Sequence, residues 1–124
     1  MASRPLIKKL DKVFSEYVRK RDSLDGHFTC CSCGQRKPYA LADAGHFINR
    51  RWMALRWDER NVHAQCSSCN RFDEGNLIGY YRFMLSKYGQ DIIDMLESLK
   101  TPYKWSDGEL DILIKDYKRR LKEL

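Results

Sequence analysis

The sequence predicts an α+β fold in which a small metal-stapled unit of two strands and a helix lies between an N-terminal helix and a helical C-terminal half. Apolar residues recur at helical spacing at both ends of the chain, and two Cys-x-x-Cys pairs enclose short strand-like segments in the middle. A length of 124 residues suits one domain. We divide it into an N-terminal helix at 1–22, a core at 27–85 and C-terminal helices at 90–124.

The helices are predicted from apolar stripes and from residues that begin or end a helix. Residues 4–21 carry apolar side chains at helical spacing, and Ser3 is positioned to cap this helix. The chain is expected to be helical from Asn70 onward, with one helix that ends at Gly89 and a next one that ends before Pro102. A last helix is expected to open at the capping-box sequence Ser106–Glu109.

Short strands are expected in the middle of the chain, where the apolar runs are too brief for helices, at residues 27–34, 43–48 and 61–65. The segment between the last two strands, 49–60, is too charged and irregular to form a core element. We expect Trp52 and Trp57 to pin this loop to the body of the protein, and stacking on nucleic-acid bases is the less favoured interpretation.

The two Cys-x-x-Cys pairs predict a structural zinc site, because four thiolates at this spacing can surround one zinc ion tetrahedrally. The expected ligands are Cys30, Cys33, Cys66 and Cys69. Cys31 lies inside the first pair and could replace Cys30, but Cys30 gives the same two-residue gap as the second pair. A zinc ion with four thiolates has no open coordination position, so catalysis requires a different set of residues.

The charge distribution indicates a polyanionic partner. The net charge is +6, and residues 1–21 hold seven basic and two acidic side chains, a net of +5. Residues 34–60 hold six basic and three acidic side chains, a net of +3. A basic surface near the metal site suits DNA, although a merely solvated basic surface has the same composition. Within this stretch, we expect Arg50, Arg51 and Arg56 to contact phosphates.

A His and two Asn residues around the Cys pairs suit phosphodiester hydrolysis. A neutral His46 imidazole could take a proton from water, and the Asn61 side-chain carbonyl could accept the proton on the other ring nitrogen. Asn70 directly follows the second Cys pair and could coordinate a divalent ion, Mg²⁺ or Mn²⁺, that stabilises the developing charge.

Three further polar residues leave alternatives open. His63 shares strand parity with Asn61, so it either faces the active site as a ligand or phosphate contact or packs as a structural histidine. Asp73 and Glu74 follow Asn70 by one turn and either reach a metal ion or lie on a solvated helix face.

The arrangement resembles the HNH, or ββα-metal, nucleases. In that family the first His is the general base, the central Asn orients it, and the last His or Asn binds metal, which implies these roles for His46, Asn61 and Asn70. The chain departs from many members at Gly45, where they carry a metal-binding Asp directly before the His. Asp43 is the nearest preceding Asp, but it is three residues before His46 and would lie on the opposite face of the strand from His46.

Five segments extend the resemblance to the NinG (Rap) family of lambdoid phages, over roughly residues 6–100; they are 14–22, 30–34, 44–47, 61–66 and 75–81. Members of that family are recombination endonucleases that act on branched DNA, including Holliday junctions. The resemblance implies a DNA-hydrolysing phage protein with a structural zinc and a catalytic divalent metal, acting in the cytoplasm of a bacterial host. Symmetric cleavage of a junction needs two active sites, which makes a homodimer plausible.

Two other classes of function remain alternatives. A zinc-knuckle module could hold branched or single-stranded DNA without cutting it, and a protein–protein adaptor could use the zinc site as a scaffold. The pairing of His46 with Asn61 favours the enzyme, since a binding module has no use for a polarised imidazole. No apolar run reaches membrane-spanning length and the N-terminus lacks a signal-peptide core, so we expect a cytoplasmic protein without membrane contact.

Overall fold

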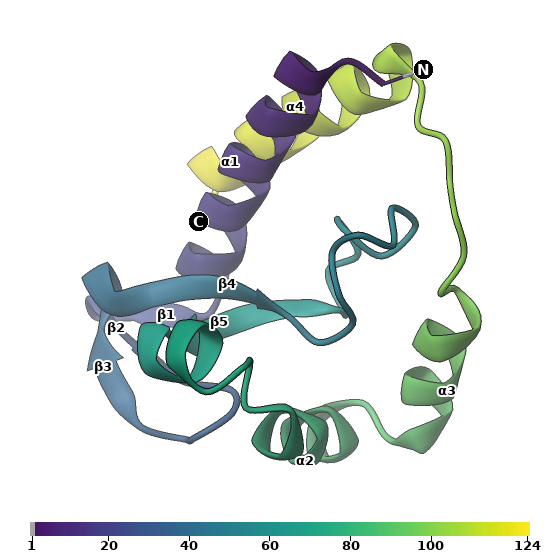
Figure 1. The fold of residues 1–124 in the computed structure, drawn as a ribbon. Helices are drawn as coiled ribbons and strands as arrows, with labels where there is room; N and C mark the ends of the chain where they lie inside the picture. The colour runs from purple at the N-terminus through teal and green to yellow at the C-terminus, as the bar shows by residue number, and fades with distance from the viewer. Residues whose placement is uncertain (1) are drawn as a thin grey trace.

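Two long helices from opposite ends of the chain, α1 at Arg4–Arg21 and α4 at Asp107–Lys122, pack side by side in the computed structural model, which describes residues 2–124 (Figure 1). The predicted caps are confirmed. The Ser3 side chain accepts from the third residue of α1, and the reciprocal capping box of Ser106 and Glu109 opens α4. These local signals placed both helix starts correctly.

The apolar stripes of α1 and α4 face each other and form the largest core cluster of the protein. Trp57, from the long loop in the middle of the chain, is buried in the same cluster, and its indole Nε1 donates to Asp11 of α1 at 3.0 Å. The buried members of this cluster are Leu10, Val13, Phe14, Tyr17, Val18, Trp57, Val62, Leu110, Ile114 and Tyr117. The prediction that Trp57 pins the loop is therefore confirmed.

The strands form two small antiparallel sheets, with the order β1-β2-β3 in one and β4-β5 in the other. Their bounds are β1 Ser23–Leu24, β2 His27–Thr29, β3 Arg36–Pro38, β4 Ala42–His46 and β5 Val62–Cys66, and a 3-10 turn at Tyr39–Leu41 joins β3 to β4. The strand expected over 27–34 is too long, because the chain leaves β2 to turn through the first Cys pair. Sequence analysis also missed β1 and β3, since two or three residues are too few to show a two-residue period.

The register of β4 against β5 decides which side chains share a face. Directly opposed pairs are His46 with Val62 and Gly45 with His63. Because successive side chains of a strand point to opposite faces, His46 and His63 lie on opposite faces of this ribbon. Val62 belongs to the core against α1 and α4, so the face of His46 is the one that looks toward those helices.

After β5 the chain makes a short π-helical turn, η2 at Ser68–Phe72, that holds Asn70. The continuous helix expected from Asn70 onward is wrong, because three successive residues, Glu74, Gly75 and Asn76, have positive φ angles of 46°, 85° and 42°. A left-handed backbone cannot continue a right-handed helix. The middle of the chain therefore runs in the order β4, β5, η2.

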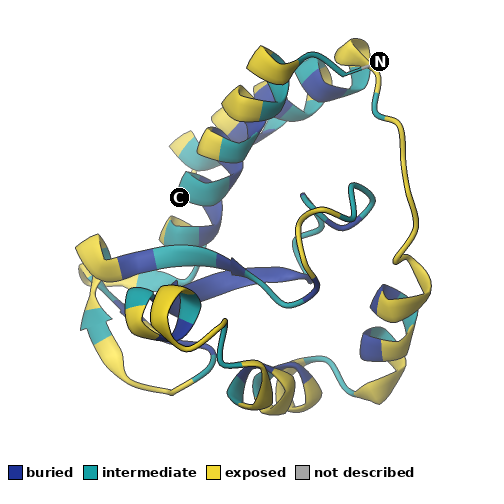
Figure 2. Cartoon of the chain, viewed as in Figure 1, coloured by how far each residue is buried: buried dark blue, intermediate teal, exposed yellow. Residues whose placement is uncertain are grey.

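Two helices, α2 at Leu77–Lys87 and α3 at Gln90–Ser98, complete the lower part of the molecule as drawn in Figure 1. They pack on a second core cluster made by Cys31, Ile48, Leu55, Tyr80, Met84, Ile93 and Leu96. An extended, mostly exposed segment then leads from α3 to α4 (Figure 2). Within the described residues, none of the helices is both long and apolar enough to cross a membrane.

Candidate metal centre and active site

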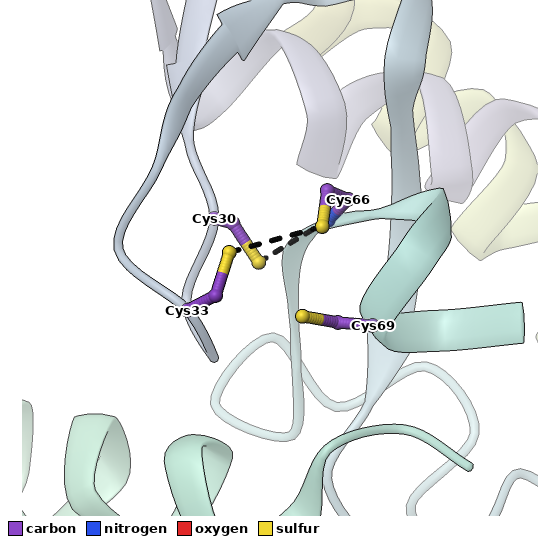
Figure 3. Close-up of side chains that lie close together, drawn as sticks. All are labelled: Cys30, Cys33, Cys66 and Cys69. Carbon is purple, nitrogen blue, oxygen red and sulfur yellow. Dashed lines mark hydrogen bonds between the residues drawn. The ribbon is translucent and has the colours of Figure 1, made fainter. Parts of the chain in front are cut away.

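Four cysteine sulfurs, from the turn after β2 and from the end of β5 and η2, point toward one another in Figure 3. All four ligand atoms lie within 4.8 Å of one another, and the Sγ atoms of Cys33 and Cys66 are 3.9 Å apart. Zinc–thiolate bonds of about 2.3 Å in a tetrahedron require sulfurs at about this spacing. The predicted cluster of Cys30, Cys33, Cys66 and Cys69 is therefore confirmed as a place that could hold a structural metal such as zinc.

Hydrogen-bond donors around the sulfurs suit thiolates. The backbone N–H of Cys66 donates to Cys30 Sγ at 3.3 Å, and Asn76 Nδ2 donates to Cys69 Sγ at 3.4 Å. Burial by itself would raise the pKa of Cys30, but the backbone N–H groups that point at its sulfur lower that pKa to about 7. Burial raises the pKa of the Cys33 and Cys69 thiols, so of these three ligands Cys30 is the one whose deprotonation the protein favours before any metal arrives.

Cys31 points away from the cluster and into the core beneath α2. It is buried beside Tyr80, and burial raises the pKa of its thiol. The sequence left Cys31 open as a replacement for Cys30, and the structure settles the choice in favour of Cys30.

The Cys cluster is tied to the helical turn and to α2 by close contacts. A Cβ at Gly79 of α2 would overlap the carbonyl oxygen of Ser32, so the helix rests directly on the first Cys turn. Gln65 of β5 joins the first Cys turn to the segment before α2, since its Nε2 donates to Ser32 Oγ at 2.8 Å and to the Gly75 carbonyl at 2.6 Å. The metal centre thus sets the positions of η2 and of the segment that follows it.

A polar cleft of about 420 Å³ opens next to η2 and contains His46. It is lined by Ala44, His46, Asn49, Arg50, Asn70, Glu74 and Gly75. A smaller hollow of about 120 Å³ shares Ala44, His46 and Arg50 with it and extends to α1. The cleft brings together three of the residues singled out from sequence, His46, Asn70 and Arg50, and it includes Glu74, which the sequence left open between metal binding and a solvated face.

The imidazole of His46 is held by the backbone of the loop beside it. Its Nε2 lies 2.8 Å from the carbonyl oxygen of Arg56, and because a carbonyl can only accept, the ring proton is on Nε2. The other nitrogen, Nδ1, keeps its lone pair. Burial lowers the pKa of His46 below its usual value, and the positive charges of Arg50 and Arg56 lower it further, against the effect of the carbonyl hydrogen bond. The ring is therefore neutral at neutral pH.

Asn61 does not contact His46, and the expected side-chain hydrogen bond between them is wrong. The Asn61 side chain is fully buried, where its Oδ1 accepts from the Ile48 N–H at 2.8 Å. Its Nδ2 donates to the carbonyls of Ile48 at 3.0 Å and Leu55 at 3.1 Å. Asn61 thus closes the loop that carries the Arg56 carbonyl, and it positions His46 only through that backbone.

Asn70 is oriented by a carboxylate from β4. Its Nδ2 donates to Asp43 Oδ2 at 3.1 Å, and Arg71 holds the same carboxylate through two contacts of 2.9 and 3.0 Å. This leaves the Asn70 Oδ1 without a donor among the described residues. A larger residue at Gly45 would have to displace the Gln65 side chain, because a Cβ there would overlap its oxygen.

His63 lies outside the cleft, so the alternative in which it faces the active site is wrong. It is 2% exposed, and its ring nitrogens bond the hydroxyls of Tyr80 at 3.1 Å and Tyr88 at 2.7 Å. Burial lowers the pKa of His63 to about 4, and the charge of Arg21 contributes in the same direction. His63 is thus a neutral, packed histidine that joins β5 to α2.

The three arginines predicted to contact phosphates differ in their surroundings. Arg50 and Arg51 are exposed, and Arg50 lines the cleft. Arg56 instead makes a two-point ion pair with Asp11, at 3.0 and 2.6 Å, and stacks over Trp57. This partner lies in α1, 45 residues away in the chain, so no local pattern indicates the pairing, and a phosphate contact by Arg56 stays a prediction.

Two participants in the site were missed by sequence analysis. The Arg56 carbonyl is a backbone group that every residue has, so the residue type at position 56 does not indicate that it binds His46. Asn49 lines the cleft, but it lies in a loop without periodicity, and only its closeness to His46 in the sequence could have suggested it. The role of Asp43 in orienting Asn70 likewise depends on a contact across 27 residues.

Comparison with known proteins places the chain in a phage family. The family described as "Bacteriophage Lambda NinG protein" matches residues 2–124. Curated relatives called Protein ninG are 34% identical over 119 residues in Escherichia phage lambda and in Escherichia phage 933W, and 33% identical in Salmonella phage P22. The match covers 95% of this chain and 56–57% of those relatives, so the chain spans little more than half of their length.

No solved structure matches this chain significantly. The family match extends over all residues that the structure describes, including the four clustered cysteines and every residue that lines the His46 cleft. It agrees with the resemblance seen in the motifs around the Cys pairs. The chain therefore belongs to the NinG family of phage proteins.

Proposed function

We propose that the chain is a metal-dependent DNA endonuclease with an HNH-like core formed by β4, β5 and η2. The observation that carries the proposal is the state of His46 in its cleft. The ring is neutral, its Nε2 is bound to the Arg56 carbonyl at 2.8 Å, and its Nδ1 is free to accept a proton. A general base needs an unprotonated nitrogen, and the hydrogen bond at Nε2 fixes the tautomer and orientation that leave Nδ1 unprotonated.

The residues of the cleft have different roles in hydrolysis. Arg50 binds the phosphate of the DNA strand, since an exposed guanidinium at the cleft matches phosphate geometry. His46 Nδ1 takes a proton from a water molecule, whose oxygen forms a bond to phosphorus while the bond from phosphorus to the leaving oxygen breaks. The loop closed by Asn61 keeps the imidazole in place during this step.

Asn70 and Glu74 are the residues of the cleft that would hold a divalent ion, Mg²⁺ or Mn²⁺. Amide and carboxylate oxygens are the ligands these hard cations prefer. Asp43 turns the Asn70 amide so that its oxygen is free, and Glu74 contributes a negative charge at the same cleft. When bound, the ion supplies electrostatic stabilisation of the charge that develops on the phosphate and the leaving oxygen.

The substrate we propose is branched DNA formed during phage recombination, such as a Holliday junction. Support comes from the basic composition of the chain, from exposed Arg50 and Arg51 and from membership of a phage family. The zinc-stapled Cys cluster would serve as a scaffold that holds Asn70, one residue after Cys69, next to the cleft.

The test is cleavage of labelled duplex, single-stranded and four-way-junction DNA, with and without Mg²⁺ or Mn²⁺. We expect metal-dependent products from the wild-type chain. His46→Ala should reduce the rate by about 10²–10⁴-fold while DNA affinity and thermal stability stay near wild type, because a general base acts in the transition state. Asn70→Ala should raise the metal concentration needed for half-maximal rate.

His27→Gln is the matched control, since it removes a histidine of the three-stranded sheet that lies outside the cleft. A wild-type chain that binds branched DNA but never cuts it would favour the binding module. A His46→Ala variant that cuts as fast as wild type would contradict the proposed mechanism.

A further inference from the structure

A second cleft, of about 450 Å³, adjoins the His46 cleft and has a different chemical character. Aromatic and aliphatic side chains make up much of its wall, and two of them are unusually open to solvent: Leu77 is 55% exposed and Tyr81 is 39% exposed. Its lining includes Phe47, Asn49, Arg51, Trp52, Leu77 and Tyr81. We name this hollow the aromatic cleft.

The aromatic cleft is continuous with the site of the proposed chemistry. Asn49 lines both hollows. Of the two neighbouring arginines, Arg50 lines the His46 cleft and Arg51 lines the aromatic cleft. Phe47 directly follows His46 at the end of β4 and lines the aromatic cleft. A DNA strand whose phosphate lay against His46 and Arg50 would therefore have the aromatic cleft beside it, on the other side of Asn49.

The charges and the rings of this cleft fit a nucleotide better than an apolar partner. The Arg51 guanidinium lies 5.3 Å from the centre of the Trp52 ring, which places a cation next to an aromatic wall. Lys100 and Glu97 also line the cleft, where their charged groups lie 3.8 Å apart, so with Arg51 the lining carries one net positive charge. Bases stack on aromatic side chains while nearby cations meet the phosphates, which is the usual pattern for unpaired nucleic acid.

The Trp52 ring forms a fixed part of the wall, because it packs against the second core cluster. Its buried Nε1 has no hydrogen-bond partner among the described residues, so packing and Arg51 hold the ring. Trp57 in the same loop differs, since its Nε1 is bound to Asp11.

We propose that the aromatic cleft binds one unpaired nucleobase next to the phosphate held at His46, and that it thereby selects branched or single-stranded DNA over continuous duplex. This inference rests on the proposed nuclease function, whose substrate class it specifies. A base inside a duplex is stacked and paired and must first be extruded, whereas a base at a branch point is already free to enter. Stacking on one aromatic platform changes affinity by roughly five- to a hundredfold.

The test compares two matched tyrosine variants. Tyr81 lines the aromatic cleft, and Tyr103 lies elsewhere at 44% exposure; the Tyr81 hydroxyl donates to Gln90 and the Tyr103 hydroxyl to Glu109. Each is changed to Ala in the non-cleaving His46→Ala chain. Affinities are measured for four-way-junction, single-stranded and duplex oligonucleotides, and 2-aminopurine at the branch reports stacking by fluorescence quenching.

We expect Tyr81→Ala to lower affinity for junction and single-stranded DNA about tenfold, to relieve the 2-aminopurine quenching, and to leave duplex affinity and the salt dependence unchanged. Tyr103→Ala should change none of these. Leu77→Gln, an exposed substitution in the same cleft, provides a second variant should Tyr81→Ala unfold.

Equal losses of affinity for duplex and junction DNA, or no loss with either cleft variant, would overturn the inference. A third result would also overturn it: the wild-type chain is a dimer, and Leu77→Gln dissociates the dimer but leaves DNA binding unchanged. The exposed side chains of the cleft would then serve to contact a second copy of the chain. Failure of the nuclease proposal is distinguishable, because binding and quenching are measured without cleavage.

Discussion

His46 Nε2 donates to the backbone carbonyl of Arg56 across 2.8 Å, and this hydrogen bond sets the protonation of the ring. The carbonyl belongs to a loop that Asn61 closes from inside by three hydrogen bonds. The two residues that sequence motifs pair as base and orienter are therefore connected through backbone and not through their side chains. This geometry changes what substitution of Asn61 should do.

Asn61→Ala should destabilise the fold as well as slow any cleavage. It leaves the buried backbone groups of Ile48 and Leu55 without partners, which costs about 2–4 kcal/mol of the free energy of unfolding. The measurement is urea denaturation with and without the substitution. Asn49→Ala is the control for stability, because Asn49 is exposed, and it should change the unfolding free energy by less than about 0.5 kcal/mol. An Asn61→Ala chain as stable as wild type would show that the loop does not depend on this side chain.

Purified protein should contain about one zinc ion per chain, and removal of the metal should abolish the cooperative unfolding transition. Structural zinc sites contribute about 10–16 kcal/mol, comparable to the whole stability of a small domain. Cys69→Ser should accordingly yield unfolded or insoluble protein. Cys31→Ala should keep its zinc and its fold, since Cys31 lies in the other core cluster. A metal-free chain that melts cooperatively near the temperature of the zinc-bound form would contradict the scaffold role.

Stability should fall as the pH decreases from about 6.5 toward 4, in part because of His63. Its pKa is about 4 in the folded chain and about 6.5 when unfolded, so between these values the unfolded chain binds a proton that the folded chain does not. His63 alone contributes about 3 kcal/mol to the free energy of unfolding. This contribution is fully present above about pH 6.5 and is lost by about pH 4.

His63→Gln removes that component of the pH dependence. The measurement is the difference in unfolding free energy between wild type and variant at several pH values, which cancels protonation of the cysteines. His27→Gln, a change in the surface sheet, should leave the wild-type profile unaltered. A constant difference between wild type and His63→Gln from about pH 7 to about pH 4 would show that His63 titrates alike in both states.

Replacing Arg50 and Arg51 with Ala should flatten the salt dependence of DNA binding. Each phosphate that an arginine no longer neutralises reduces the slope of log affinity against log salt by about 0.9. Arg56→Ala should instead lower stability, because it leaves Asp11 without its ion-pair partner. Arg119→Ala, on the exposed face of α4, serves as the surface control. An unchanged slope in the Arg50 and Arg51 variant would place the phosphate contacts on another surface.

Several features of this protein are determined by the sequence itself, because they depend on neighbours along the chain. The two Cys-x-x-Cys pairs fold into turns that each aim two sulfurs the same way, and Ser3 and Ser106 cap the helices that follow them. The α+β class, both terminal helices and the four clustered cysteines could all be read in this way. These signals are local, so the rest of the fold does not alter them.

Only the tertiary structure decided which partners the polar residues found. By strand parity Asn61 and His63 share a face. The pairing of His46 with Val62 puts that face on the side of the ribbon opposite His46. The loop residue Arg56 pairs with Asp11, which lies in α1, 45 residues away in the chain. A register is set by the packing of whole faces, and a buried polar group bonds whatever the fold brings near it. Sequence spacing names the candidates, and contacts between distant segments assign their roles.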